Sequence, residues 1–261
     1  MRISCVQMDV LLGKPGDNLA KVKTLVRSSA ESGADVIVLP ETWNVGFFPR
    51  EGLTELADPD GEITRRELGA LAGELRVNLV AGSAATLRDG KVFNTAYVFD
   101  RDGECVGRYD KTHLFSPMGE DVFFEKGSDL CTFSLDGVQC GLILCYDIRF
   151  PELTRSLALE GIDILFVPAQ WPSVRAEHWR TLTKARAIEN QIFLACCNGC
   201  GTAGETVYGG NSAVYDPWGV VLVAAGEKEE VISADCDLSV IGNIRSSMHV
   251  FNDRRPELYH Y

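Results

Sequence analysis

The chain has 261 residues, 46% of them hydrophobic, and a formal net charge of −12 at pH 7. This charge disfavours nucleic acids as partners, since backbone phosphates are bound by clustered lysine and arginine. No apolar run approaches the ~20 residues of a membrane span, and the chain starts in strand-like sequence without a signal-peptide pattern. We therefore expect a cytoplasmic protein that binds neither membranes nor nucleic acids.

The first part of the chain alternates strand and helix signals. Residues 3–8 predict a strand, residues from about 17 to 32 a helix, and residues 34–40 a buried parallel strand, which completes a β-α-β unit. A loop-like segment, 42–60, follows. A helix is then expected at about 62–76, with strands near 77–82, 92–99 and 104–108.

The second part repeats this alternation without a fixed-period repeat or a Pro/Gly/Ser linker. Strands are expected near 130–134, 138–145, 163–167, 191–198, 211–216, 219–224 and 230–235, and helices at 151–160 and 175–189. The pattern favours one α/β domain over residues 1–261, with a two-layered sheet core, outer helices and a polar, aromatic tail from about 236 to 261.

Nine cysteines, an odd number, occur in a chain large enough to fold around a core. Several lie in strand-like runs, so we expect reduced, buried thiols. Cys196 and Cys197 are adjacent in a strand and should point to opposite faces. With no second Cys/His pair at ligand spacing, no metal site is predicted.

One cysteine has a different setting. Cys145 ends the apolar run Gly141–Leu144, and Pro151 and Glu152 follow in a pattern typical of a helix start. Such a thiol lies at the carboxyl end of a strand, where open α/β sheets place their chemistry. The alternative is a buried cysteine that only packs. Arg149 and Glu152 are expected to fix the turn through an ion pair or hydrogen bonds.

Two ionisable residues share this setting. Glu41 follows the apolar strand that ends at Pro40, and Lys111 comes soon after the strand at 104–108. Because parallel strands of one sheet end at one edge, Glu41 and Cys145 can converge, and Lys111 can join them if its strand runs the same way. The alternatives are a helix-capping glutamate and a solvated lysine.

Together these groups suit acyl transfer from an amide or a nitrile. A carboxylate beside a thiol can accept its proton and return it to a leaving amine. A lysine and the backbone N–H of Tyr146 can stabilise the oxyanion of a tetrahedral intermediate. We therefore predict Cys145 as nucleophile, Glu41 as general base and acid, and Lys111 with Tyr146 N–H as the oxyanion site.

The sequence resembles the carbon–nitrogen hydrolase (nitrilase) superfamily over nearly its whole length. The resemblance rests on three motifs in the family's order: Leu39–Glu41 (LPE), Tyr109–Leu114 (YDKTHL) and Cys145–Glu152 (CYDIRFPE). It implies an α-β-β-α sandwich with two central mixed sheets flanked by helices, and a Glu-Lys-Cys triad. It also implies a homodimer with no metal or organic cofactor, and a supporting role for Glu120.

A narrower resemblance concerns the substrate. The segment Gln170–Arg175 (QWPSVR), followed by His178 and Trp179, is similar to the ω-amidase branch, whose members act on 2-oxoglutaramate and related ω-amides of dicarboxylates. Such a substrate needs a cation at the far end of its pocket, and Arg175 is the candidate. Trp171 and Phe47 are the other predicted substrate contacts.

Several alternatives stay open on the sequence. Another amidase, a carbamoyl-amide hydrolase or a nitrilase would use the same three residues. A papain-like mechanism would use His113 or His178 instead. A non-catalytic binding protein is a further alternative, although no member of the triad is missing.

Overall fold

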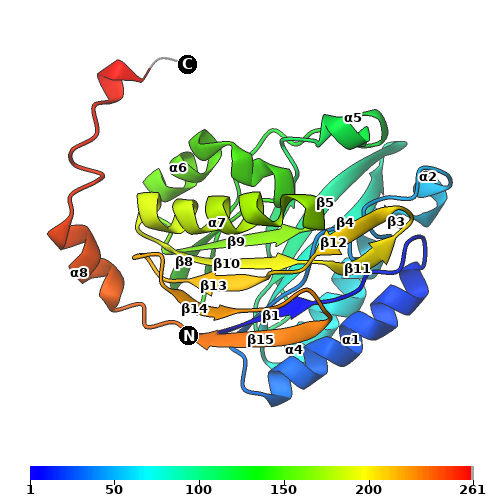
Figure 1. The fold of residues 1–261 in the computed structure, drawn as a ribbon. Helices are drawn as coiled ribbons and strands as arrows, with labels where there is room; N and C mark the ends of the chain where they lie inside the picture. Colours follow the sequence, from blue (N-terminus) through cyan, green and yellow to red (C-terminus); the bar gives the residue numbers. More distant parts are fainter. Residues whose placement is uncertain (260–261) are drawn as a thin grey trace.

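Two β-sheets pack face to face, and helices cover their outer faces, in the computed structural model, which describes residues 1–259 (Figure 1). Helices α1 (Pro15–Glu31) and α4 (Ala70–Leu75) cover one sheet. Helices α6 (Pro151–Leu159) and α7 (Ala176–Asn190) cover the other. The predicted α-β-β-α sandwich is confirmed.

The first sheet has the strand order β15-β1-β2-β4-β5-β6, and the short β3 pairs with β4. Strands β1, β2 and β4 are parallel, whereas β5 is antiparallel to both β4 and β6. Strand β6 therefore runs in the same direction as β2. The strand bounds are β1 (Arg2–Gln7), β2 (Val36–Val38), β3 (Asp58–Pro59), β4 (Asn78–Arg88), β5 (Lys91–Phe99), β6 (Cys105–Asp110) and β15 (Glu230–Asp235).

The second sheet has the order β14-β13-β10-β9-β8-β7. Its central strands β8, β9 and β10 are parallel. The strand bounds are β7 (Thr132–Leu135), β8 (Val138–Leu142), β9 (Ile164–Ala169), β10 (Phe193–Asn198), β13 (Ala213–Tyr215) and β14 (Val221–Ala224).

Several elements differ from the predictions. The strand expected at 138–145 ends at Leu142, and Cys145 instead begins the 3-10 helix η3. A separate hairpin of β11 and β12 was not predicted. The remaining elements are α2 (Leu53–Leu56), α3 (Glu62–Thr64), the π-helical segment η1 (Arg65–Gly69), η2 (Ser116–Met118), α5 (Glu120–Phe123), η3 (Cys145–Arg149), η4 (Ser173–Arg175), β11 (Cys200–Ala203), β12 (Thr206–Gly209), α8 (Val240–Ser247) and η5 (Pro256–Leu258).

The tail expected at about 236–261 contains helix α8 and then runs along one end of the sandwich (Figure 1). The side-chain amide of Gln191, which follows α7, donates a hydrogen bond to the carbonyl of Met248 at 2.9 Å. This bond ties the segment after α8 to the body. The last two residues, 260 and 261, lie outside the described part of the chain.

Apolar side chains form one layer between the sheets and one beneath each pair of helices. Cys197 belongs to the layer between the sheets, and Cys196 to the layer beneath α6 and α7. The two thiols therefore point to opposite faces, as predicted. Within residues 1–259, no group of three or more His, Cys, Asp or Glu side chains is arranged to hold a metal ion.

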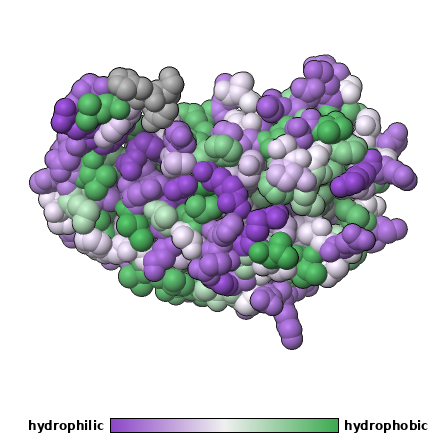
Figure 2. Space-filling view, turned by 45° about the horizontal axis from the view of Figure 1, so that its top comes forward, coloured by the Kyte–Doolittle hydropathy of each residue, from purple (hydrophilic) through white to green (hydrophobic). Residues whose placement is uncertain are grey.

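Hydrophilic and hydrophobic residues are interspersed on the face shown in Figure 2. Among the described helices, none combines the length and the apolar character that crossing a membrane requires.

A glycine in β4 permits a close approach that positions the end of β2. Gly82 has φ +57°, and a Cβ at this position would lie 1.9 Å from the carbonyl oxygen of Pro40. The register of β4 against β5 shifts at this point, between Val80 and Ser83. Since Pro40 precedes Glu41, the bulge at Gly82 fixes the backbone from which that glutamate projects.

Replacement of Gly82 with alanine should lower the free energy of unfolding by about 2 kcal/mol or more, because it combines a left-handed backbone with a steric overlap. Denaturant unfolding measures this change. Gly16→Ala is the control, because Gly16 lies in helix α1 and a Cβ there would meet no atom within 4 Å. Equal unfolding midpoints for the two variants would contradict the role given to Gly82.

Candidate active site

Glu41 is fully buried at the end of β2, between the two sheets. One carboxylate oxygen, Oε2, accepts a hydrogen bond from the backbone N–H of Gln170 at 2.9 Å. The backbone N–H of Glu41 donates to the carbonyl of Ala169, the last residue of β9, at 3.4 Å. The glutamate from one sheet is thus held by the end of a strand in the other sheet.

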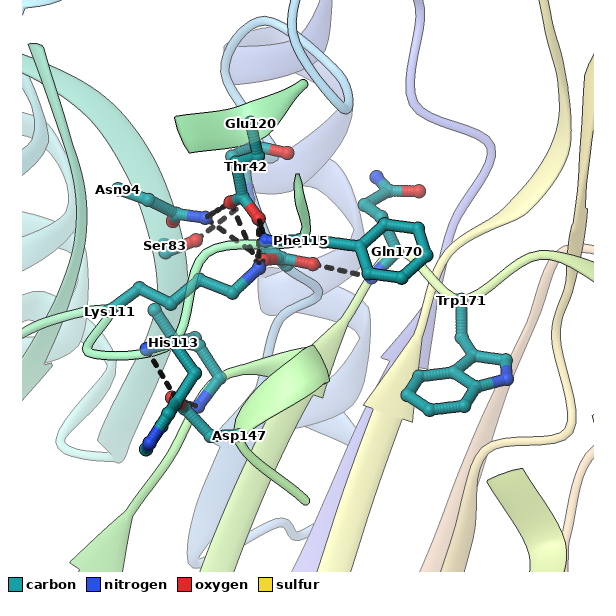
Figure 3. Close-up of polar contacts among 12 residues, drawn as sticks. Thr42, Ser83, Asn94, Lys111, His113, Phe115, Glu120, Asp147, Gln170 and Trp171 are labelled. Atoms are coloured by element: carbon teal, nitrogen blue, oxygen red, sulfur yellow. Dashed lines mark hydrogen bonds and ion pairs between the residues drawn. The ribbon is translucent and has the colours of Figure 1, made fainter. Parts of the chain in front are cut away.

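Lys111 follows β6 and is also fully buried. Its ammonium group contacts Glu41 Oε1 at 2.8 Å and both oxygens of Glu120, at 2.9 and 2.8 Å. Asn94 of β5 donates to the same two carboxylates at 2.9 and 3.1 Å. Figure 3 shows Asn94, Lys111 and Glu120 converging in this network. Glu120, for which the family resemblance implies a supporting role, thus lies in direct contact with the lysine.

Cys145 lies at a sharp turn after β8. Its φ is +47°, an unfavourable value for a residue with a side chain. It begins the short helix η3, and its side chain is buried in the layer beneath α6 and α7. Strain of this kind persists only where surrounding contacts fix the backbone.

Asp147 supplies those contacts. Its buried carboxylate accepts hydrogen bonds from the backbone N–H of Leu144 at 2.9 Å and from the hydroxyl of Tyr109 at 2.8 Å. It also accepts a hydrogen bond from the backbone N–H of His113 at 3.0 Å, and it contacts Nδ1 of the His113 ring at 2.8 Å. The carboxylate therefore ties the Cys145 turn to the segment around Lys111.

The expectation that Arg149 and Glu152 fix this turn is wrong. Among the described residues, no ion pair joins the two, and Glu152 is exposed. The guanidinium of Arg149 instead lies over the Trp171 ring, 4.7 Å from its centroid. The left-handed backbone at Cys145 redirects the chain into η3, so that Asp147 points inward and Arg149 points toward the pocket.

Glu41, Lys111 and Cys145 converge, but not at the edge of a single sheet as expected. Glu41 and Lys111 follow β2 and β6 of the first sheet, whereas Cys145 follows β8 of the second. They meet because the carboxyl ends of β2, β6 and β8 lie on the same side of the sandwich. The condition set for Lys111 is met, since β6 runs in the same direction as β2.

Burial and the nearby Glu41 carboxylate raise the pKa of the Cys145 thiol well above its usual value, and the Lys111 ammonium only partly opposes them. Burial acts to lower the pKa of Lys111, but the Glu120 and Glu41 carboxylates outweigh it and raise that pKa well above its usual value. The resting site thus holds a neutral thiol beside a protonated lysine.

A narrow slot leads to the thiol. Its lining combines Cys145 and the two cations Arg149 and Arg175 with aromatic and apolar side chains, and its cavity volume is about 10 Å³. The guanidinium of Arg175 lies 5.0 Å from the centroid of the Phe115 ring. The pKa of Arg149 is lowered by burial and by the charge of Arg175, so the two cations repel each other across the slot.

The other predicted substrate contacts, Phe47 and Trp171, also line the slot, as does Tyr146, whose backbone N–H is the predicted oxyanion donor. The indole N–H of Trp171 donates to the Arg175 carbonyl at 2.8 Å. Neither histidine of the papain-like alternative adjoins the thiol in this geometry. His113 is held by Asp147, and His178 lies 3.3 Å from an Arg149 nitrogen.

Sequence reasoning missed Asp147 and Asn94. Asp147 lies within the Cys145–Glu152 stretch, but charge alone did not distinguish it from Arg149 and Glu152. Asn94 left a clearer signal, because an amide in the middle of a largely buried strand needs a buried partner.

The fold and this cluster are typical of hydrolases that act on carbon–nitrogen bonds. The model of the carbon–nitrogen hydrolase family matches residues 2–246. The chain belongs to this family, and it is a hydrolase acting on carbon–nitrogen bonds.

Relatives of the chain include named amidases. It is 41% identical over 257 residues to the 2-oxoglutaramate amidase of Bacillus subtilis, covering 98% of each chain. It is 33% identical to the omega-amidase NIT2 of Mus musculus, covering 99% of this chain and 96% of the relative. A carbon–nitrogen hydrolase superfamily structure from Xanthomonas campestris matches with a TM-score of 0.91 at 30% identity, covering 98% and 97% of the two chains.

The effect of the Glu41 charge on the pKa of the Cys145 thiol can be tested directly. Glu41→Gln removes a negative charge and a hydrogen bond that raise the pKa of Cys145, so that pKa should fall. Titration of the thiolate absorbance, with a Cys145→Ala background to subtract the other thiols, measures the shift. An unchanged or higher thiol pKa in Glu41→Gln would contradict the proposed electrostatic coupling.

Proposed function

We propose that this chain hydrolyses the terminal amide of a small dicarboxylate monoamide of the 2-oxoglutaramate type, releasing ammonia through a thioester. The observation that carries the proposal is the slot itself, which has a thiol beside a carboxylate and a lysine, and two mutually repelling arginines, Arg149 and Arg175. A carboxylate bound between the arginines relieves their repulsion. The ω-amide of the same molecule then reaches Cys145.

In the first half of the reaction, Cys145 Sγ bonds to the amide carbon while Glu41 accepts the thiol proton. Direct transfer is needed because the thiol is neutral at rest, as its raised pKa indicates. Lys111 and the backbone N–H of Tyr146 stabilise the oxyanion. The carbon–nitrogen bond breaks, the nitrogen takes the proton from Glu41, and ammonia leaves a thioester.

In the second half, Glu41 accepts a proton from water as the water oxygen attacks the thioester carbon. The carbon–sulfur bond breaks, the proton returns to sulfur, and the carboxylic acid is released. Glu120 touches neither reacting group in this scheme. Its two contacts with the Lys111 ammonium hold that cation beside Glu41.

The same proposal includes the wider setting of the enzyme. We infer one catalytic domain with a C-terminal tail, a homodimer as its assembly, a cytoplasmic location and chemistry without a cofactor. The supporting arguments are the unbroken alternation of the elements and the family resemblance.

Cys145→Ala should abolish ammonia release from 2-oxoglutaramate while leaving the fold intact. A coupled ammonia assay and circular dichroism measure the two properties. Cys105→Ala is the matched control, since Cys105 is an exposed free cysteine on β6 and should be dispensable. Turnover retained by Cys145→Ala would exclude the thioester scheme.

Arg149→Gln and Arg175→Gln should each raise KM for 2-oxoglutaramate about tenfold or more, the usual effect of losing a charged hydrogen-bond partner. Neither should raise KM for butyramide, which has no carboxylate. The control is Arg180→Gln, an exposed residue of α7 paired with Glu177. Equal losses on both substrates would show that the arginines support the fold of the slot instead of binding the carboxylate.

Amide and nitrile substrates would use the same three residues, so a comparison of substrates has to separate the two classes. Release of ammonia from an amide requires a proton donor, which Glu41 becomes after it has accepted the thiol proton. Steady-state comparison of 2-oxoglutaramate, succinamate, a simple aliphatic amide and a nitrile separates the substrate classes. No preference for the dicarboxylate monoamides would contradict the proposed substrate class.

A further inference from the structure

A second cavity adjoins the slot on the side away from the thiol. This outer hollow has a volume of about 360 Å³, against about 10 Å³ for the slot. The slot has room for about one water molecule, so any substrate must displace part of its wall. The wall between the two cavities consists of residues that line both: Phe115, Met118, Pro172 and Arg175.

The far side of the outer hollow combines apolar and polar side chains. Its apolar part consists of Pro117 of η2, Val174 of η4 and Val207 of β12, and its polar part of Ser173, Glu205 and Thr206. Val174 is 83% exposed and Val207 is 50% exposed. Single exposed valines are common, but two of them with a proline around one hollow next to an active-site slot form a surface that an apolar group can cover.

Arg175 determines which part of a substrate reaches this hollow. Its guanidinium, stacked on Phe115, belongs to the shared wall. A carboxylate held by Arg149 and Arg175 places the carbon that bears it at this boundary. A second hollow of about 320 Å³ borders the slot only at Phe47 and Met118, away from both arginines.

We propose that the outer hollow is a second subsite, which binds an apolar acyl group carried on the carbon next to the substrate carboxylate. The corresponding substrates are N-acylglutamines, in which the acyl group is attached through the α-nitrogen. This inference rests on the proposed function. The ω-amide is hydrolysed as before, and the acyl–nitrogen bond stays intact. Glu205 at the rim disfavours acyl groups that end in an acid.

The test is a series of substrates in which only the acyl chain grows: N-acetyl-, N-butanoyl- and N-hexanoylglutamine, with 2-oxoglutaramate as the short reference. Burial of each methylene should raise kcat/KM for ammonia release about two- to fourfold until the hollow is filled. The double variant Val174→Ser/Val207→Ser should lower kcat/KM for the hexanoyl compound about fivefold and leave 2-oxoglutaramate within about twofold. Val220→Ser is the control, because Val220 is 54% exposed and lines neither cavity.

The outcomes separate the two proposals. A flat or falling series, together with turnover of 2-oxoglutaramate, overturns the subsite and leaves the proposed function standing. An equal loss in Val220→Ser and in the double variant also overturns the subsite. If neither 2-oxoglutaramate nor any N-acylglutamine is hydrolysed, the proposed function and the subsite both fail.

Discussion

The structure depends on a buried lysine held between two buried carboxylates. Lys111, Glu41 and Glu120 are fully buried, and the three charges sum to −1. Such a cluster is stable only if its remaining polar atoms are satisfied, because unpaired buried charges are very costly. The amide of Asn94 and the backbone N–H groups of Gln170 and Phe115 meet this requirement. These donors come from both sheets and from the loop after Lys111, so the ion cluster also constrains how the layers meet.

In the proposed mechanism, this cluster allows a neutral thiol to act as the nucleophile. Burial, together with the Glu41 carboxylate, raises the pKa of Cys145 and disfavours a resting thiolate. Glu41 lies within hydrogen-bonding reach of the thiol, while Lys111 stays protonated and available to an oxyanion. In this scheme the thiolate forms only as the amide carbon approaches. The sulfur is therefore not permanently ionised, and other electrophiles are less able to modify it. The strained turn at Cys145, held by Asp147, keeps the sulfur in place for that step.

Residues at strand ends could be predicted from the sequence, whereas side-chain directions after a sharp turn could not. Glu41 and Cys145 follow apolar strands and Lys111 follows the more polar β6, and the position after a strand determines which end of the sandwich each residue occupies. The prediction that Arg149 fixes the turn was wrong because the φ of +47° at Cys145 changes the direction of the residues that follow it. No sequence pattern at Cys145 indicates this left-handed backbone. The β11–β12 hairpin was missed because Gly199–Gly210 lacks a long apolar alternation, although it contributes Val207 to the outer hollow.

The charge of the whole chain bears on how an anionic substrate would be captured. With a net charge of −12, the protein as a whole repels a dicarboxylate monoamide at long range. At physiological ionic strength such repulsion is screened beyond about 8 Å, so capture depends on groups that the substrate touches. In the proposed function, the arginines of the slot are those groups. Under that proposal, their spacing from Cys145 decides which chain lengths bring the ω-amide to the sulfur, so the contact that captures the anion also selects the substrate.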